Sequence, residues 1–560
     1  MQWRRSKKSF RHLDLNPDEI LLDVHNLPAF NTQQFEGRME RAIPKKSLWK
    51  LFGVMVFVAL CFSVRLGYLQ LARANYYQTK SEQNSLDHIP VFADRGVIYD
   101  RNGVELAWNS IGNEDVPTFR EYIKTEGFAS MLGYVSYPAK DKKGILWQDR
   151  VIGKDGIEKE LDVELAGKNG TQLIETTVEG DILPGSLIEE PEQGGNVTLA
   201  LDARVQETLF AGIKALAEQS GYVGGAGAVI DVETGELVAM TSYPEFNQSV
   251  MALGKDATLI REYMQGEGRP FLNRMTEGLY TPGSIVKPFL GLAALQEGVI
   301  DPYKTIFSSG SLKVPNPYNP GQFTVFKDNK AHGAVDMRHA IAVSSNVYFY
   351  QIGGGFGDQK GLGIANIEKY SRMFGIGEKT GIDMAGELVG TIPSVEWKAK
   401  RFKGDPWRIG DTYNTSIGQY GFQVTPIQML RATASIASRG TLVTPTIHKS
   451  TSGKPVASTE LPFNNSQFSV IHDAMRLVVT EGTGGALLNS TVSVAAKTGT
   501  AQIKNNTRVN SWAIGFFPLE KPKYAFTVLM ENGPIVSSGA THAMKPVITW
   551  FAEHPEMLTN

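Results

Sequence analysis

The chain has 560 residues, of which 42% are hydrophobic and 20% are charged, and its formal net charge at pH 7 is −2. This length is too great for one ordinary hydrophobic core, so we expect two or more folded domains, and the near-neutral charge argues against nucleic acid as a partner. Because Cys61 is the only cysteine, an intramolecular disulfide and a thiolate cluster for zinc or an iron–sulfur centre are excluded.

Residues 1–47 are polar, carry nine lysines and arginines and show no sustained periodicity, so we predict a flexible tail. Residues 48–71 are the candidate membrane segment. Their uninterrupted apolar core, Leu51–Val64, is short for a span and would also suit a signal peptide or a buried core helix. The long region before it argues against a signal peptide, and Trp49 and Tyr68 suit the two membrane interfaces. We therefore predict a single-pass anchor.

The positive-inside rule predicts the orientation of this anchor. The basic tail places the N-terminus in the cytoplasm, so the rest of the chain is expected outside the cytoplasmic (inner) membrane.

Between residues 72 and 196 the sequence has short β-prone runs separated by glycine and asparagine turns, which predicts a β-rich domain. The segment Asp100–Gly103 predicts a tight turn between two strands. Residues 189–196 are rich in glutamate, proline and glycine, so we place a domain boundary there. The β-prone runs are His88–Phe92, Gly96–Tyr99 and Thr171–Val178.

From about residue 197 to the C-terminus, helical and strand patterns alternate. Two strands, a helical middle, three strands and a terminal helix predict an α+β domain in which helices cover an antiparallel sheet. The predicted helices are 205–218, 467–480 and 541–553, and the predicted strands are 228–232, 236–241, 492–502, 511–516 and 524–531.

The segment Tyr280–Phe289 places a serine and a lysine at the start of a predicted helix. Pro282-Gly283 is a turn signal, and the apolar residues after it can line one face of a helix. Ser284 and Lys287 then lie on the same face. A hydroxyl beside an amine, next to the free N–H groups of a helix start, is typical of an activated serine nucleophile.

Two further motifs accompany this pair: Ser344-Ser-Asn346 in an apolar segment, and Lys497-Thr-Gly-Thr500 in the first of the three C-terminal strands. Together, Ser-x-x-Lys, Ser-x-Asn and Lys-Thr-Gly are the signature of penicillin-binding proteins and related β-lactamases. Each motif alone is a weak signal. Ser47-Leu-Trp-Lys50 repeats the first motif, and Lys379–Gly381 repeats the third in a glycine-rich segment that suits a loop.

The chemistry of acyl transfer needs each part of this set. Ser284 must lose a proton to attack a carbonyl, and Lys287 can accept it only if burial and the second cation, Lys497, lower its pKa. Ser344 can pass a proton to the leaving amine, and the Asn346 amide can hold the substrate and Lys287 in place.

The Lys-Thr-Gly strand is expected to bind the substrate. Gly499 has no side chain, so an extended peptide could lie alongside the strand and pair with its backbone. Thr498 and Thr500 offer hydroxyls to a substrate carboxylate, and the backbone N–H groups of Ser284 and Thr500 are candidate oxyanion donors.

From about Phe92 to its C-terminus, the chain resembles a class B penicillin-binding protein, a monofunctional D,D-transpeptidase of peptidoglycan. It is more similar to the elongation type, penicillin-binding protein 2, than to the division type. Beyond the three motifs, the resemblance rests on residues 94–103, 153–161, 273–274, 396–398, 407, 410–412 and 417–419.

The resemblance implies a penicillin-binding transpeptidase fold, with a five-stranded antiparallel sheet flanked by helices over residues 197–560, on a β-rich pedestal over 72–196. It implies cross-linking of D-alanyl-D-alanine stem peptides in cell elongation, inhibition by β-lactams and no cofactor. The implied partners are a membrane glycan polymerase of the shape, elongation, division and sporulation family and cell-shape scaffold proteins.

Three departures from the family pattern stand out. Only Val104–Met131 separates the Asp-Arg-Asn-Gly turn from Leu132-Gly-Tyr134, so the head lobe of relatives is largely missing and the pedestal is reduced. The family's Gly-Gln-Gly becomes Gly418-Gln419-Tyr420-Gly421, with an inserted tyrosine. Some relatives bind zinc beside Ser-x-Asn; Asp328 and His332 echo that site, but Ser345 replaces the thiol, so we expect no metal.

Other functions fit the same motifs. A β-lactam hydrolase would need a dedicated base for deacylating water, which the sequence does not mark. A D,D-carboxypeptidase differs only in using water in place of an amine acceptor, and the sequence does not separate the two cleanly. A non-enzymatic scaffold that kept the fold would not need the complete set of five polar residues, which are Ser284, Lys287, Ser344, Asn346 and Lys497.

Overall fold

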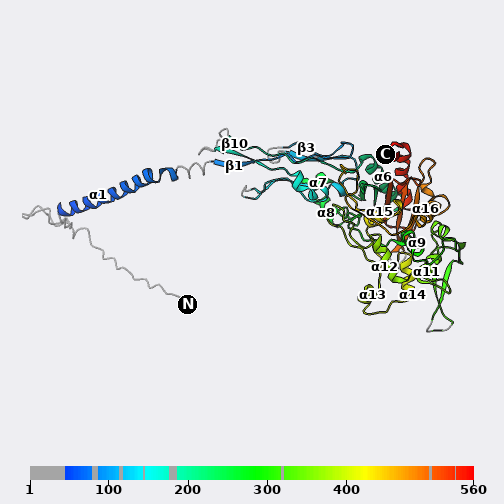
Figure 1. The fold of residues 1–560 in the computed structure, drawn as a ribbon. Helices are drawn as coiled ribbons and strands as arrows, with labels where there is room; N and C mark the ends of the chain where they lie inside the picture. Colours follow the sequence, from blue (N-terminus) through cyan, green and yellow to red (C-terminus); the bar gives the residue numbers. More distant parts are fainter. Residues whose placement is uncertain are drawn as a thin grey trace, which may run out of the picture. The chain divides into compact units, whose positions relative to one another are not determined.

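A computed structural model describes residues 45–77, 86–112, 118–142, 146–175, 186–316, 319, 321–503, 507–535 and 538–559. The chain divides into two compact units (Figure 1). One comprises Met1–Asp87 with Glu175–Asp181, and the other comprises His88–Ile174 with Ile182–Asn560.

The first unit contains a long apolar helix. This helix, α1, spans Lys45–Gly67 and continues as a π-helical segment, η4, over Tyr68–Ala72. None of these residues is buried, and their length and composition would allow the helix to cross a membrane. The predicted anchor at 48–71 therefore coincides with this helix. Of the predicted tail, residues 1–44 lie outside the described residues.

Small β-sheets and short helices make up the chain from residue 86 to 198. A four-stranded sheet has the order β11-β2-β3-β4, and a three-stranded sheet has the order β1-β9-β10. The strands of these two sheets are β1 (Leu86–Val91), β2 (Ile98–Tyr99), β3 (Glu105–Ile111), β4 (Thr118–Tyr122), β9 (Gly170–Glu175), β10 (Ser186–Glu189) and β11 (Val197–Thr198). The other elements are α3 (Ala129–Leu132), β5 (Val135–Ser136), β6 (Ala139–Lys140), β7 (Leu146–Gln148), β8 (Ile152–Gly153), α4 (Gly156–Glu160) and α5 (Asp162–Leu165).

The predicted turn at Asp100–Gly103 joins β2 to β3. The Gly103 N–H donates to the Asp100 carbonyl at 3.1 Å, and the Asp100 carboxylate accepts from the Asn102 and Val104 N–H groups. Strands also form at the three predicted β-prone runs, of which residues 176–178 lie outside the described part of the chain.

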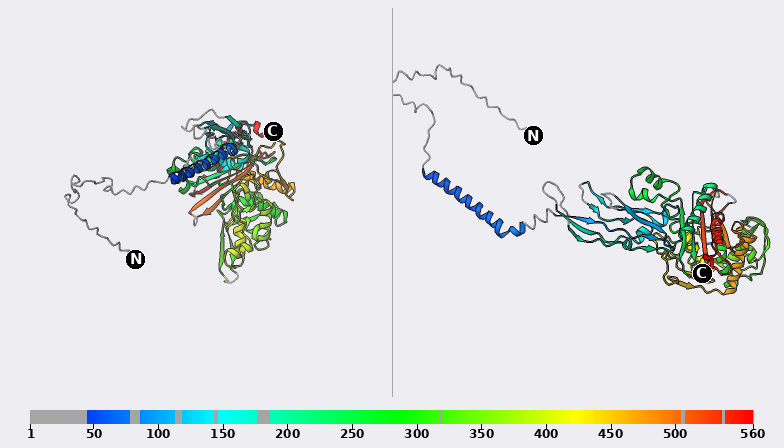
Figure 2. Two further views of the ribbon diagram at one scale, coloured as in Figure 1. Left: turned by 90° about the vertical axis from the view of Figure 1, so that its left-hand side faces the viewer. Right: turned by 90° about the horizontal axis from the view of Figure 1, so that it is seen from above.

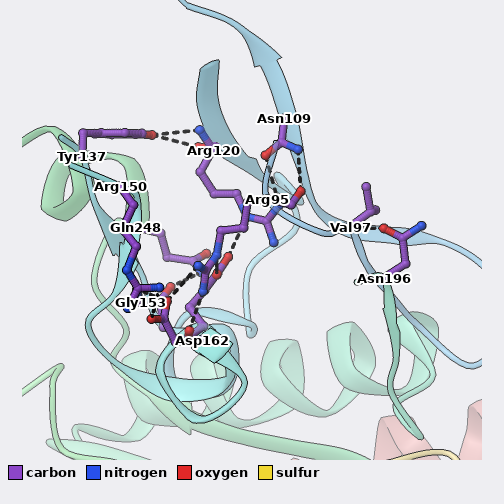
Figure 3. Close-up of polar contacts among 12 residues, drawn as sticks. Arg95, Val97, Asn109, Arg120, Tyr137, Arg150, Gly153, Asp162, Asn196 and Gln248 are labelled. Atoms are coloured by element: carbon purple, nitrogen blue, oxygen red, sulfur yellow. Dashed lines mark hydrogen bonds and ion pairs between the residues drawn. The ribbon is translucent and has the colours of Figure 1, made fainter. Parts of the chain in front are cut away.

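A buried ion cluster joins this β-rich region to α4 and α5; Figure 3 shows its members Arg95, Arg120 and Asp162. Arg95 lies 2.6 Å from Glu158 and 2.8 Å from Asp162, and Arg120 lies 2.7 Å from Glu158. Removing one partner from a buried ion pair typically costs about 3–5 kcal/mol, because the other charge is left unpaired. The cluster therefore ties the strands firmly to these helices.

The β-rich region is also hydrogen-bonded to the elements that follow it. The Glu245 carboxylate accepts from the Gly127 and Ala129 N–H groups at 2.9 and 3.0 Å. The Gln206 amide donates to the carbonyls of Gly127 and Met240, both at 2.7 Å. These contacts lie within the second compact unit, and the domain boundary at 189–196 stays a prediction.

A five-stranded antiparallel sheet forms the centre of the C-terminal region. Its order is β13-β12-β22-β21-β20, so the last three strands in the chain are neighbours and β20 lies at one edge. The strands are β12 (Gly224–Asp231), β13 (Leu237–Tyr243), β20 (Ala495–Ile503), β21 (Arg508–Phe517) and β22 (Tyr524–Gly533).

Helices cover both faces of this sheet, as Figure 2 shows in two further views. Helices α6 (Ala203–Ser220) and α17 (Ala540–Glu553) pack on one face, around Val229 and Val528. Helix α15 (Pro426–Ala437) packs on the other face, and α16 (Asn465–Thr480) packs along β20. Side chains of a strand alternate between the two faces of the sheet. Val229 therefore packs in the core under α6 and α17, and Ala228 and Ile230 pack in the core under α15.

The remaining elements lie between β13 and β20 or at the C-terminus. They are α7 (Gln248–Leu253), α8 (Ala257–Gln265), η5 (Gly283–Val286), α9 (Lys287–Gln296), β14 (Ile306–Ser308), β15 (Ser311–Pro315), β16 (Phe323–Lys327), β17 (Gly333–Val335), α10 (Met337–Ala342), α11 (Asn346–Gly354), α12 (Gly363–Met373), α13 (Val395–Arg401), α14 (Ile409–Ser416), β18 (Thr441–Val443), β19 (Ser458–Glu460), η6 (Gly485–Leu487) and α18 (Glu556–Thr559). All helices and strands predicted after residue 197 are present within a few residues of their predicted bounds.

Candidate active site

Ser284 lies in a single turn of 3-10 helix, η5, that leads directly into α9. Pro288 falls in the first turn of α9, where a missing N–H breaks no helical hydrogen bond. The predicted start of a helix at this serine is confirmed. The expectation of a single apolar face was too narrow, because every residue of Lys287–Ala294 is buried and α9 is a core helix.

Four hydrogen bonds fix the turn that carries Ser284. The Tyr280 and Val424 backbones exchange two hydrogen bonds of 2.9 Å, and the Trp512 indole N–H donates to the Thr281 carbonyl at 3.0 Å. The Gly283 N–H donates to the Gly418 carbonyl at 3.0 Å. A Cβ on Gly418 would lie 2.2 Å from the Gly283 oxygen, so only glycine permits this approach.

Lys287 is fully buried and faces the Ser-x-Asn motif. Its ammonium donates to Asn346 Oδ1 and to the Ser344 carbonyl, both at 2.8 Å, and to Ser344 Oγ at 3.3 Å. Burial, and then repulsion from Lys497, lower the pKa of Lys287 well below its ordinary value, and Asp328 opposes this shift. Among the described residues, no hydrogen bond joins Ser284 to Lys287.

Ser344 lies between two lysines. It has a φ of +60° in the connection from α10 to α11, a left-handed conformation that costs a residue other than glycine about 1–3 kcal/mol. The Lys497 ammonium donates to Ser344 Oγ at 3.0 Å, on an oxygen that Lys287 also reaches. The strained backbone therefore holds one hydroxyl within hydrogen-bond distance of both cations.

Asp328 organises the N-terminus of α11. Its carboxylate accepts from the backbone N–H groups of Asn346 at 2.8 Å and Val347 at 3.0 Å, and from the Ser345 hydroxyl at 2.8 Å. His332 lies 3.7 Å from the same carboxylate. These contacts suit helix capping, and no group of three His, Cys, Asp or Glu residues suited to a metal occurs in the described chain.

The Lys-Thr-Gly motif lies on β20, the edge strand of the sheet. Lys497 is fully buried, and burial lowers its pKa to about 7. The Thr498 hydroxyl contacts the Thr483 hydroxyl, and the Thr500 side chain is exposed.

Gly499 packs against the turn that carries Ser284. A Cβ at this position would lie 2.9 Å from Ile285 Cγ2 and 3.0 Å from the Pro282 carbonyl oxygen. The missing side chain therefore lets β20 approach the turn that carries Ser284. Gly499 also lines the cleft, and its predicted role in letting a substrate peptide lie alongside the strand stays a prediction.

These residues open into one cleft with a volume of about 870 Å³. Ser284, Ser344 and Asn346 line it together with Thr498, Gly499 and Thr500. Further lining residues that lie outside the three motifs include Lys327, Tyr350, Asn414, Thr483 and Trp512. No sequence signal marks these five, because they come from separate elements. The second Lys-Thr-Gly at Lys379–Gly381 lies in a loop and does not line the cleft.

Comparison with family models matches two segments of the chain. Residues 225–549 match the model "Penicillin binding protein transpeptidase domain", and residues 113–199 match "Penicillin-binding Protein dimerisation domain".

Curated and solved relatives agree with these models. The chain is similar to "Peptidoglycan D,D-transpeptidase MrdA" of Acinetobacter baumannii, with 29% identity over 92% of this chain and 88% of the relative. A solved structure of penicillin-binding protein 2 with MreC from Helicobacter pylori has a TM-score of 0.68 and 27% identity, covering 85% of this chain and 99% of that chain. Another, described as "Structural coordination of polymerization and crosslinking by a peptidoglycan synthase complex", has a TM-score of 0.69 and 26% identity, covering 90% and 97%.

Proposed function

The chain belongs to the penicillin-binding protein transpeptidase family, and we propose that it cross-links peptidoglycan through an acyl-enzyme formed on Ser284. The predicted family, the α+β transpeptidase fold and the D,D-transpeptidase class are confirmed by the family model and the relatives named above. Because these relatives are a peptidoglycan D,D-transpeptidase and penicillin-binding protein 2, cross-linking in cell elongation is favoured over a carboxypeptidase or a β-lactam sensor or hydrolase.

In the first half-reaction, Ser284 Oγ attacks the carbonyl carbon of the penultimate D-alanine of a donor stem peptide. An ester C–O bond forms and the amide C–N bond to the terminal D-alanine breaks. Neutral Lys287 takes the serine proton, since its lowered pKa leaves more of the amine free at neutral pH. The leaving amine receives a proton through Ser344 Oγ, and D-alanine departs.

In the second half-reaction, an acceptor amine attacks the ester carbonyl. The new amide C–N bond forms, the C–O bond to Ser284 breaks, and a proton from the amine returns to Ser284 Oγ. We assign the oxyanion to the backbone N–H groups of Ser284 and Thr500, and the donor carboxylate to Thr498 and Thr500. β-Lactams acylate the same serine.

One observation carries this assignment. The Ser344 hydroxyl lies 3.0 Å from Lys497 and 3.3 Å from Lys287, and both lysines are fully buried. Burying two lysines around one hydroxyl costs stability. The arrangement suits catalysis, because it favours a neutral amine on Lys287 and places the Ser344 hydroxyl where it can relay a proton.

We assign α1 to a single-pass membrane anchor, with the N-terminus in the cytoplasm and the catalytic domain outside. Its length and composition support the anchor, and the nine basic residues before position 48 support the orientation. One solved relative is in complex with MreC, and the other is described as part of a peptidoglycan synthase complex. We therefore assign a membrane glycan polymerase and a cell-shape scaffold protein as partners of this chain.

A donor pentapeptide that ends in D-alanyl-D-alanine tests the reaction directly. With the full-length enzyme and an added acceptor amine, we expect release of D-alanine and formation of a new amide product. Ser284→Ala should abolish both products, whereas Ser47→Ala, in the chance Ser-x-x-Lys sequence on α1, should retain them. Release of D-alanine with only hydrolysed peptide, whatever the acceptor, would indicate a carboxypeptidase instead.

A further inference from the structure

Tyr420 forms part of the cleft wall in an unusual backbone conformation. Its φ is +63°, and it lines the same cleft as Ser284. The neighbouring Gly418 carbonyl holds the Gly283 N–H, so the Tyr420 loop contacts the serine turn directly. A tyrosine in the left-handed region costs about 1–3 kcal/mol, so the surrounding structure must hold it there.

Three aromatic side chains hold the Tyr420 ring. Its centroid lies 5.8 Å from those of Trp397 and Trp407, both nearly perpendicular, and 6.3 Å from that of Phe402, which is stacked at 18°. Phe402 nevertheless keeps 48% of its surface exposed. The aromatic surface therefore continues from the cleft wall, through Tyr420, to the outside of the protein.

A buried lysine, Lys398, lies beside this aromatic cluster and forms ion pairs with the nearby aspartates. The Lys398 ammonium lies 2.6 Å from Asp411 and 2.9 Å from Asp405, and 5.9 Å from the centre of the Tyr420 ring. Arg408 also pairs with Asp405, at 2.5 and 2.7 Å. Asp405 and Asp411 are thus already paired with Lys398 and Arg408.

Exposed cations beside Phe402 remain uncompensated. Residues 397–404 contain four cations and no acid, although the whole chain has a net charge of −2. Lys398 is the buried one; Lys400, Arg401 and Lys403 are exposed and form no ion pair with any described residue. Lys400 still interacts with Glu396 at longer range, so Arg401 and Lys403 are the least compensated. We call Arg401, Phe402 and Lys403 the Phe402 patch.

We propose that Tyr420 and the Phe402 patch form the acceptor subsite, which binds a second stem peptide whose free amine is flanked by carboxylate groups. This proposal rests on the proposed transpeptidase function. Gly283 lies next to both Thr500 of β20 and Gly418, so the serine turn adjoins both the strand assigned to the donor and the Tyr420 loop. A donor bound along β20 leaves the Tyr420 side open to the acceptor, and the cations there complement its carboxylates.

The acceptor amine then approaches the Ser284 ester from the Tyr420 wall. Its nitrogen forms the amide bond as the Ser284 C–O bond breaks, and its proton returns to Ser284 Oγ. Aromatic contact with Tyr420 and Phe402 would position the peptide, and Arg401 and Lys403 would select for negative charge. The subsite therefore affects the second half-reaction and not the first.

The test compares two acceptors on full-length enzyme: a short peptide amine with free carboxylates, and the same peptide with those carboxylates converted to carboxamides. The variant is Arg401→Gln with Lys403→Gln. The matched control is Lys521→Gln with Lys545→Gln, which removes two exposed cations outside the Phe402 patch. Transpeptidation is measured against acceptor concentration, and acylation by a fluorescent penicillin is measured in parallel.

For the carboxylate acceptor, we expect the Phe402-patch variant to lose roughly three- to tenfold in kcat/KM, mainly through KM, as loss of two exposed charge contacts predicts. The carboxamide acceptor and the control variant should show less than a twofold change. Raising the salt concentration should weaken the wild-type preference for the carboxylate acceptor.

Equal losses for both acceptors, or no loss for either, would overturn the proposal. A matching loss in penicillin acylation would also overturn it, because the residues would then act on the first half-reaction. If the wild-type enzyme is not acylated at all, the proposed function itself fails, which is a different result from failure of the acceptor subsite.

Discussion

At the scale of single residues, the site depends on how two buried lysines affect each other. Lys287 and Lys497 share the Ser344 hydroxyl, and burial lowers the pKa of both. Repulsion from Lys497 lowers the pKa of Lys287 further. A base must be neutral to accept a proton, so the acylation rate should rise with pH as Lys287 loses its proton.

Lys497→Met removes that repulsion, so the pKa of Lys287 should rise. The acid limb of penicillin acylation against pH should then move to higher pH, by roughly one to three units for a nearby charge. The rate should also fall at every pH, because Lys497 no longer contacts Ser344. Lys379→Met, in the other Lys-Thr-Gly sequence, should leave the midpoint in place. An unchanged or lower midpoint for Lys497→Met would contradict the assigned role of Lys287.

At the scale of elements, the site depends on the close contact between β20 and the serine turn. Gly499 faces the Pro282 carbonyl and Ile285, and Gly418 faces the Gly283 carbonyl on another side of the turn. These contacts place the edge strand, the start of α9 and the loop before α15 around Ser284. A small displacement of any one would alter the cleft.

Gly499→Ala tests the role of this packing. Its methyl group would lie 2.9 Å from Ile285 Cγ2 and 3.0 Å from the Pro282 carbonyl oxygen, so β20 or the serine turn must shift. We expect a loss of stability of about 1–3 kcal/mol, as for other overpacked sites, and a slower acylation by penicillin. In Gly485→Ala the new Cβ meets nothing within 4 Å, so stability and acylation should stay near wild type. The acylation rate is measured with fluorescent penicillin, and stability is measured by thermal unfolding. Wild-type acylation and stability in Gly499→Ala as well as in Gly485→Ala would show that the contact is dispensable.

At the scale of the whole molecule, the sequence predicted the features that depend on local patterns and missed the contacts between residues far apart in the chain. Hydrophobic periodicity located α6 and the three C-terminal strands, and the motifs identified Ser284, Ser344 and Thr498, which line one cleft. The capping role of Asp328 was missed, because its partners at Asn346 and Val347 are backbone groups some twenty positions away, which no residue pattern marks. For the same reason, the ion cluster of Arg95 and Glu158, 63 residues apart, left no local signal.

The aromatic surface around Tyr420 was predictable only in part. The departure from the family's Gly-Gln-Gly marked the position in the sequence, but the ring contacts come from three residues that precede it by 13 to 23 positions. Only the folded chain brings them together. The packing of Gly499 against the serine turn left no signal for a related reason, since a strand pattern does not say which neighbour each face meets.

The most direct measurement is to label membranes that contain the full chain with a fluorescent penicillin and to map the adduct by mass spectrometry of its peptides. We expect one adduct, in the peptide that contains Ser284, and its complete loss in Ser284→Ala. An adduct on another residue, or labelling that persists unchanged in Ser284→Ala, would show that Ser284 is not the nucleophile.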